Sequence, residues 1–258
     1  MYGKNPPPLR FNVYRNVVLR KDHRPYYFKR AYQKFQKFYA NRYLGTQFEN
    51  LGRGGVFMKP WHVELFGGPI SMGSYHTVIA SPDRKVRLTV WAGSDDIRGI
   101  EIGDYCLICP GVRIASAERI TIGHSCMIAS GAYLTDSDWH DIYDRSIPVG
   151  KSAPITLEEN VWIGDSVIVC KGVTIGKNSI IGAGSVVVSD IPDNAIAVGN
   201  PAKVVRYLDP SEGMKTRGHW LANPGKLARD FDILDRAQLE GNTITGWIRS
   251  LLFPRKGD

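Results

Sequence analysis

An aliphatic residue recurs every six positions through the middle of this 258-residue chain. The spacing is unbroken at six successive residues: Leu157, Ile163, Val169, Ile175, Ile181 and Val187. A period of six fits neither an α-helix, which repeats every ~3.6 residues, nor simple strand alternation, so each unit is expected to be a short strand followed by a turn. Units this short cannot bury a core alone, so the pattern predicts a stacked solenoid.

The spacing also predicts which residues stack. With three hexads per turn, Leu157 is expected beside Ile175, Ile163 beside Ile181 and Val169 beside Val187. Glycines follow several of these positions and suit tight corners. The same phase appears upstream at Ile102, Ile108, Ile114 and Ile120, resumes two residues late at Ile122, Ile128 and Leu134, and leaves fainter traces at Phe66, Met72, Val78 and Val90.

Residues 100–206 resemble the hexapeptide-repeat acyltransferases, in particular the maltose, galactoside and polysaccharide O-acetyltransferase branch. The resemblance rests on the segments ITLEENVWIGDSVIV, VTIGKNSIIGAGSVV and DIPDNAIAVGNPAKVVR. It implies a mainly β fold, a left-handed parallel β-helix solenoid with helical N- and C-terminal appendages. We therefore expect a basic, helix-containing segment over 1–60, a β-helix acyltransferase domain over 61–206 and a helical extension over 207–258.

The repeat is interrupted once by a loop. Leu134 and Leu157 are 23 positions apart, five more than three hexads, which predicts an excursion loop over 135–154. Long irregular loops on rigid scaffolds often carry function. His140 lies near the middle of this loop among several aspartates. An imidazole in a carboxylate-rich setting suits a general base near neutral pH.

The resemblance assigns roles within this loop. In the family, a histidine of the excursion deprotonates the acceptor hydroxyl, which then attacks the thioester of acetyl-coenzyme A. Trp139 could wall the acceptor pocket or merely anchor the loop, and Arg145 could contact an anionic substrate or pair with Asp144. The implied catalytic base is His140, and the group that orients its ring is Asp138 first, Asp141 second and Asp136 third. The implied substrate contacts are Asp136, Trp139 and Arg145.

Acetyl-coenzyme A is the co-substrate that the resemblance implies. Small corner residues would border its pantetheine arm, and cations would meet its phosphates. The alternative is that these residues are ordinary corner and exit positions of the β-helix. The implied contacts are Trp162, Gly182, Ala183, Gly184 and Ser185 for the pantetheine, Pro201 near the adenine, and Lys203 and Arg206 for the phosphates.

No metal site is predicted. The four cysteines occupy ordinary repeat positions, and residues three apart on a strand point to opposite faces, so Cys106 and Cys109 are not expected to share a metal. We interpret all four as small buried thiols in a reducing cytoplasm. The gamma-class carbonic anhydrases share this solenoid but need three converging histidines with two close in sequence, and the six histidines here contain no close pair.

Charge divides the chain into three parts. Residues 1–60 carry 13 Lys/Arg against 2 Asp/Glu, residues 61–202 carry 10 against 16, and residues 203–258 carry 10 against 7. Residues 25–45 place Phe28, Tyr32, Phe35 and Tyr39 at helical spacing among basic residues, which predicts a basic amphipathic helix. This helix and the apolar, basic C-terminal segment either pack on the solenoid or a neighbouring subunit, or contact an anionic membrane. Neither shows a nucleic-acid-binding motif.

The function expected from these features is O-acetyl transfer from acetyl-coenzyme A to a hydroxyl of a saccharide or glycoconjugate. The alternatives are N-acylation of an amino sugar and a non-catalytic β-helix scaffold that binds polyanions or membrane. The resemblance implies a homotrimer with active sites between subunits. The N-terminus lacks the apolar segment of a secretory signal, and the sequence has no apolar run long enough to span a bilayer. We expect a cytoplasmic protein, peripheral at the inner face of the membrane if its basic ends bind lipid.

Overall fold

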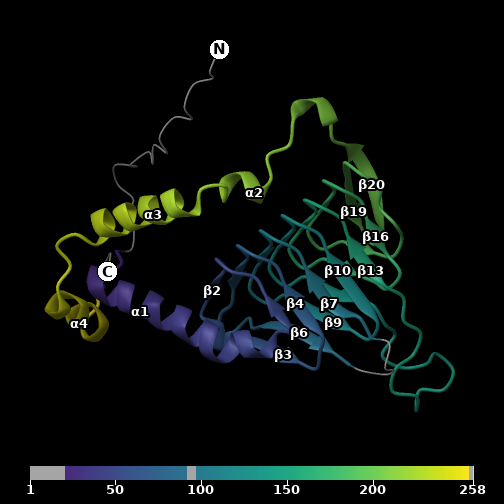
Figure 1. Cartoon of the computed structure of the whole chain (residues 1–258), viewed down its shortest axis with the longest axis horizontal. Coiled ribbons are helices and arrows are strands. Elements are labelled where there is room, and N and C mark those ends of the chain that lie inside the picture. Colours follow the sequence, from purple (N-terminus) through teal and green to yellow (C-terminus); the bar gives the residue numbers. More distant parts are fainter. Residues whose placement is uncertain (1–20, 92–96, 256–257) are drawn as a thin grey trace. The chain divides into compact units, whose positions relative to one another are not determined.

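The computed structural model describes residues 21–91, 97–255 and 258. Its largest part is a left-handed parallel β-helix, in which each coil of the chain gives one short strand to each of three sheets (Figure 1). Aliphatic side chains from all three sheets point inward and form one continuous core. The predicted fold class is confirmed.

Each sheet stacks strands from successive coils of the chain. The first sheet contains, in spatial order, β1 (Asn50–Leu51), β4 (Ile70–Met72), β7 (Gly99–Ile102), β10 (Arg119–Ile122), β13 (Ile155–Leu157) and β16 (Thr174–Ile175). The second contains β2 (Val56–Met58), β5 (Thr77–Ile79), β8 (Leu107–Ile108), β11 (Met127–Ile128), β14 (Trp162–Ile163), β17 (Ile180–Ile181), β19 (Ala195–Gly199) and β20 (Ala202–Tyr207). The third contains β18 (Val186–Val187), β15 (Ile168–Val169), β12 (Tyr133–Thr135), β9 (Arg113–Ser116), β6 (Val86–Val90) and β3 (Val63–Phe66).

The predicted register is confirmed. The structure pairs Leu157 with Ile175, Ile163 with Ile181 and Val169 with Val187, and all six side chains are buried. The prediction that Phe66 continues the buried six-residue phase is wrong. In β3 it is Leu65 that aligns with the buried Leu88, and Phe66 ends the strand with 54% of its surface exposed.

A helix packs on the first coil. Helix α1 (Tyr26–Tyr39) continues into a π-helical turn (Ala40–Leu44) and a 3-10 turn (Gly45–Gln47), so strand pairing begins at β1, before the expected boundary at residue 61. Trp61 lies in another 3-10 turn (Pro60–His62), and its ring centroid is 5.8 Å from that of Tyr32, 6.0 Å from Phe35 and 5.9 Å from Tyr39. Three of the four aromatic residues of the predicted stripe therefore pack on the β-helix.

After β20 the chain returns along the β-helix. A 3-10 turn (Pro210–Glu212) leads to α2 (Arg217–Trp220). The guanidinium of Arg217 donates from Nε to the carbonyl of Tyr105 at 2.8 Å and from Nη2 to the hydroxyl of Thr77 at 3.1 Å. These bonds fix the returning segment on the early coils of the second sheet.

The two ends of the chain form a second compact unit. It comprises the described residues up to Ala31 and those from Ala228 onward, and contains the start of α1, most of α3 (Pro224–Leu239) and all of α4 (Ile244–Leu252). Within it, Lys29 Nζ lies 2.7 Å from a carboxylate oxygen of Asp235, and Phe28 packs against Trp247 with centroids 5.1 Å apart. The two predicted appendages thus meet in one unit. None of the helices in the described part of the chain is long and apolar enough to span a membrane.

Candidate functional site

The excursion loop leaves the β-helix after β12 and returns at β13, and it projects beyond the stacked strands (Figure 1). Its two ends pair with each other. Ser137 and Ser152 form an antiparallel bridge, and the backbone N–H of Asp138 donates to the carbonyl of Lys151 at 2.9 Å. The loop is therefore held by a narrow, hydrogen-bonded neck.

His140 lies just beyond this neck and is exposed to solvent. Gly150 packs against its backbone: the N–H of Gly150 donates to the carbonyl of Asp138 at 2.7 Å, and a Cβ at Gly150 would lie 2.4 Å from the carbonyl oxygen of His140. Close contact with Gly150 thus fixes the backbone of His140, the predicted base. Gly150 was not predicted as a functional residue. The sequence signal that could have indicated it is a glycine inside the excursion loop, directly before Lys151.

Neither of the first two aspartates predicted to orient the imidazole does so. Asp138 pairs with Lys171 at 2.5 Å, and Asp141 accepts hydrogen bonds from the backbone N–H groups of Asp144 at 2.9 Å and Tyr143 at 2.8 Å. These last bonds hold the pKa of Asp141 below its usual value. Within the described residues, the His140 ring has no hydrogen bond to any aspartate, so both orienting assignments are corrected for the single chain.

Asp136 is not available to a substrate. It is fully buried, and its carboxylate accepts hydrogen bonds from the hydroxyl of Ser116 at 2.7 Å and from the backbone N–H groups of Ala117 at 2.7 Å, Glu118 at 3.0 Å and Arg119 at 2.8 Å. Buried carboxylates need such donors to offset desolvation. Asp136 therefore ties the start of the excursion to the corner of the preceding coil, which corrects its predicted substrate contact and its orienting role.

Trp139 contacts two aromatic residues of the third-sheet side of the β-helix. Its Nε1 donates to the hydroxyl of Tyr133 at 3.2 Å, and its ring lies edge-on to Trp91 with centroids 6.5 Å apart. Arg145 is exposed, and among the described residues it forms no ion pair with Asp144. The carboxylate of Asp144 instead accepts hydrogen bonds from the hydroxyl and the backbone N–H of Ser146, and these bonds lower the pKa of Asp144.

Three of the predicted coenzyme contacts, Trp162, Lys203 and Arg206, lie on strands of the second sheet. Trp162 aligns with Ile180, Ile180 with Ile196, and Ile196 with Arg206, so an exposed indole and an exposed guanidinium stand at the two ends of one row. The row between them is apolar. An apolar floor that ends in a cation suits a long molecule with a phosphorylated end.

A β-bulge brings the two predicted phosphate contacts to the same side. β19 and β20 pair antiparallel, with Lys203 opposite Val198 and Arg206 opposite Ile196, and their register shifts between Ile196 and Ala197. Residues three apart on a regular strand point to opposite faces, and the extra residue of a bulge removes that difference. Lys203 and Arg206 therefore both point outward from the sheet.

The small corner after β17 is partly accessible. Ala183 and Gly184 are exposed, and Gly184 has φ +69° with no atom within 4 Å of the position that a Cβ would take. Ser185 is buried: its hydroxyl donates to the carbonyl of Gly182 at 2.7 Å and accepts from Gly199 N–H at 3.0 Å. The Ser185 hydroxyl therefore holds the corner together, which leaves the backbone of this corner for the predicted pantetheine contact.

His140 and the coenzyme face of the same chain lie on opposite sides of the β-helix. The excursion emerges at the corner between the third and first sheets, because it joins β12 to β13. In a three-sided prism, that corner faces the second sheet across the core. Trp162 and Arg206 belong to the second sheet, so the buried core separates them from His140.

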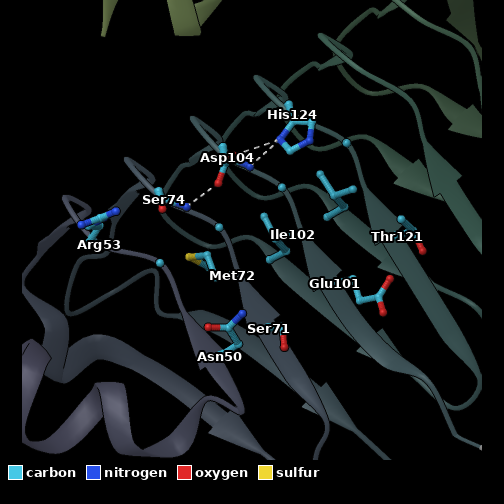
Figure 2. Close-up of a pocket in the computed structure, with 15 residues that line it drawn as sticks. Asn50, Arg53, Ser71, Met72, Ser74, Glu101, Ile102, Asp104, Thr121 and His124 are labelled. Atoms are coloured by element: carbon cyan, nitrogen blue, oxygen red, sulfur yellow. Dashed lines mark hydrogen bonds and ion pairs between the residues drawn. The ribbon is translucent and has the colours of Figure 1, made fainter. Parts of the chain in front are cut away.

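A groove on the first sheet was not anticipated (Figure 2). Its floor is a row of polar residues in register, from Asn50 through Ser71 and Glu101 to Thr121. Polar residues directly before the ladder positions of successive coils are the sequence signal that marks such a floor.

The rim of this groove follows the corner between the first and second sheets (Figure 2). A carboxylate oxygen of Asp104 accepts from the backbone N–H of Ser74 at 2.6 Å, and the N–H of Asp104 donates to Nδ1 of His124 at 2.9 Å. The side chains of Asp104 and His124 therefore each accept a hydrogen bond from a backbone N–H at the rim.

Metal-binding constellations are absent from the described residues, where no three His, Cys, Asp or Glu side chains converge. All four cysteines are free thiols. Cys106 and Cys126 are buried, as predicted, and donate from sulfur to backbone carbonyls. Cys109 and Cys170 are only half-buried, which corrects the prediction for these two. Burial raises the pKa of Cys109 and Cys170, so both thiols favour the protonated form that does not ligate metals.

Comparison with known proteins agrees with the observed architecture. Residues 154–189 match the family model described as bacterial transferase hexapeptide (six repeats). Galactoside O-acetyltransferase of Escherichia coli is 44% identical over 92 residues, which cover 35% of this chain and 45% of the relative. A candidate acetyltransferase of Saccharomyces cerevisiae is 40% identical over 119 residues, covering 45% of this chain and 60% of the relative. The chain spans about half the length of the curated relatives it matches.

A solved structure matches over most of its own length. It is a mutant of AntD, an N-acyltransferase from Bacillus cereus, in complex with dTDP-4-amino-4,6-dideoxyglucose and coenzyme A. The similarity has a TM-score of 0.52 at 19% sequence identity, and covers 73% of this chain and 96% of AntD. At this identity the likeness establishes the fold.

Proposed function

We propose that this chain, a hexapeptide-repeat protein of the transferase type, is an O-acetyltransferase that moves acetyl from acetyl-coenzyme A to a hydroxyl of a saccharide or glycoconjugate. The observation that carries the proposal is His140, an exposed imidazole on a loop clamped to an otherwise regular β-helix. The partial match to galactoside O-acetyltransferase supports both the reaction and the class of acceptor.

His140 acts as the general base in this proposal. Its ring removes the proton of the acceptor hydroxyl while the hydroxyl oxygen attacks the thioester carbonyl. The C–S bond then breaks, the coenzyme A thiolate leaves, and it takes up the proton that His140 holds. A positioned histidine contributes about a hundredfold to ten-thousandfold to such proton transfers.

Acetyl-coenzyme A fits the outer face of the second sheet. The co-substrate supplies an activated acetyl group, and this chain supplies the binding surface. Lys203 and Arg206 point outward together and would bind the phosphates, while Trp162 and the apolar row beside it would border the pantetheine. Gly184 leaves room for a ligand to approach the backbone at the next corner.

We infer that the active site forms between two chains of a homotrimer. His140 and the coenzyme face of one chain are separated by its core, so a base from one subunit must meet the donor bound to another. A closed cyclic assembly repeats one such interface at every subunit. Complementation between two inactive variants tests this inference.

We infer that the protein is cytoplasmic, with peripheral contact at the inner face of the membrane. Leu251, Leu252 and Phe253 are strongly exposed at the end of α4, and the exposed Arg255 lies close by in the sequence. The other nearby cation, Arg249, pairs with the carboxylate of Asp258 at 2.7 Å. Exposed apolar residues next to cations suit an anionic bilayer surface. Sedimentation with anionic vesicles at low salt tests this contact, and a chain that stays in the supernatant would contradict it.

Labelled acetyl-coenzyme A and a panel of soluble saccharides test the activity. We expect label to transfer to at least one acceptor and hydroxylamine to release it, as esters react and amides do not. Label that resists hydroxylamine would indicate N-acylation and would replace the O-acyl assignment. A failure to bind coenzyme A in calorimetry would instead favour a non-catalytic scaffold.

A further inference from the structure

A row of two exposed aromatic rings and one half-buried ring follows one corner of the β-helix and ends beside His140. Phe66 closes β3 and Trp91 follows β6, and their ring centroids are 4.7 Å apart. Trp91 in turn lies 6.5 Å from Trp139, which directly precedes His140. We call these three residues, Phe66, Trp91 and Trp139, the aromatic corner.

Hydrogen bonds hold parts of the aromatic corner in place. The backbone N–H of Trp91 donates to the carbonyl of Ser116 at 2.9 Å, and the side chain of Trp139 is fixed by the hydroxyl of Tyr133. Phe66 and Trp91 still expose 54% and 48% of their surfaces. Large apolar rings held in place at the surface are typical of recognition sites, because they need little reordering on binding.

Polar groups lie along one side of the rings. On the outer face of the third sheet, Phe66 aligns with Thr89, Thr89 with Ala115, and Ala115 with Thr135. The parallel row beside it carries Arg113, whose guanidinium stacks on Tyr133 at 4.2 Å. The hydroxyl of Thr135 already donates to the carbonyl of Ser137 at 3.3 Å. The surface thus combines apolar ring faces with the Thr89 hydroxyl and the Arg113 guanidinium as donors.

We propose that the aromatic corner binds the sugar units of an oligosaccharide acceptor beyond the unit that is acetylated. A pyranose ring has an apolar C–H face, which packs on an aromatic ring, and a rim of hydroxyls, which bonds to threonine and arginine donors. Because the corner spans several coils and ends at the loop of His140, it suits an extended chain rather than a single sugar. This proposal rests on the proposed function, since it extends the acceptor side of the same site.

Titration of the protein without acetyl-coenzyme A tests the binding. The probes are linear tetrasaccharides of glucose, galactose and N-acetylglucosamine, with tryptophan fluorescence as the readout. We expect saturable binding of at least one at millimolar concentration, and about tenfold weaker binding for Phe66→Ala and Trp91→Ala. Trp91→Phe, which keeps an aromatic face, is expected to retain most of the affinity. The matched control is Phe38→Ala, which removes an equally exposed ring from α1 and is expected to bind like the wild type.

Three results would overturn the proposal. The first is that no tetrasaccharide binds. The second is that Phe66→Ala, Trp91→Ala and the wild type bind equally well. The third is that either alanine variant changes its molecular mass in sedimentation, which would make the corner a subunit interface. The proposed activity is tested separately. If acetyl transfer proceeds while both alanine variants leave KM for every acceptor unchanged, the corner is not an acceptor subsite but the transferase assignment stands. Saturable glycan binding without acetyl transfer would leave the subsite and remove the reaction.

Discussion

The carboxylate of Asp136 accepts a hydrogen bond from the backbone N–H of Ala117 at 2.7 Å, between neighbouring coils of the β-helix. The same buried carboxylate accepts two further backbone N–H groups and a hydroxyl. It stands where the excursion begins. The buried side chain of Asp136 thus fixes the backbone of the preceding corner and the start of the loop that carries His140.

Replacement of Asp136 is expected to destabilise the β-helix. Asp136→Ala leaves buried backbone donors without an acceptor, and each such group costs about 1–3 kcal/mol. We expect the free energy of unfolding to fall by about 3 kcal/mol or more, measured by urea denaturation. The control Asp144→Asn, in an exposed part of the same loop, is expected to stay within about 0.5 kcal/mol of the wild type. Equal stability of the two variants would contradict the role of Asp136.

Gly150→Ala tests whether the neck positions His140. The added methyl would overlap the carbonyl oxygen of His140, so the loop backbone must shift. A displacement of about 1 Å at a catalytic group can cost about a hundredfold in rate. We expect kcat to fall by about that factor with little change in the melting temperature. Gly218→Ala, where the new methyl meets only ordinary contacts of 3.4 Å or more, is the control. Wild-type kcat in Gly150→Ala would show that the neck does not position the base.

Buried His76 is expected to make stability depend on pH. Burial lowers its pKa below the usual 6.5, although Nδ1 lies 2.7 Å from the carbonyl of Gly73. The neutral ring is therefore favoured in the folded state. Its contribution to stability is full above pH 6.5 and is lost as the pH falls from there through the lower folded value. We expect the melting temperature to fall as the pH drops below 6.5, and the fall to be smaller in His76→Asn. An identical fall in both proteins would exclude His76 as the cause.

The period of six was enough to predict the fold, because every ladder position buries an aliphatic side chain and the register follows from the spacing alone. Leu157 beside Ile175 is one case. The roles within the excursion were less predictable. Asp136, Asp138 and Asp141 look alike in sequence, and only three-dimensional neighbours distinguish a buried corner residue, a partner of Lys171 and a turn cap.

The coenzyme face illustrates the same limit at a finer scale. Lys203 and Arg206 were predicted together by resemblance, but their spacing of three would separate them on a regular strand. A β-bulge places both side chains on the same face of the sheet, and the six-residue period of the sequence does not predict a bulge. Phe66 fits the hexad phase but is exposed, because its neighbour Leu65 takes the inward position.

Complementation tests the shared active site. His140→Ala removes the base and Lys203→Glu with Arg206→Glu repels the phosphates, so each protein alone is expected to be inactive. In mixed trimers, a site that joins an intact His140 from one chain to an intact coenzyme face from another is functional. After equal mixing and reassembly we expect about a quarter of wild-type activity, since each site draws its two halves independently. A mixture as inactive as its components would place the site within one chain.

The most direct test is the turnover of His140→Ala with an identified acceptor. The matched control is His219→Ala, which removes another exposed histidine far from the excursion in sequence. We predict that kcat falls by about a hundredfold to ten-thousandfold in His140→Ala, while coenzyme A binding and the kcat of His219→Ala remain at wild-type values. Wild-type turnover in His140→Ala would contradict the assignment of His140 as the general base.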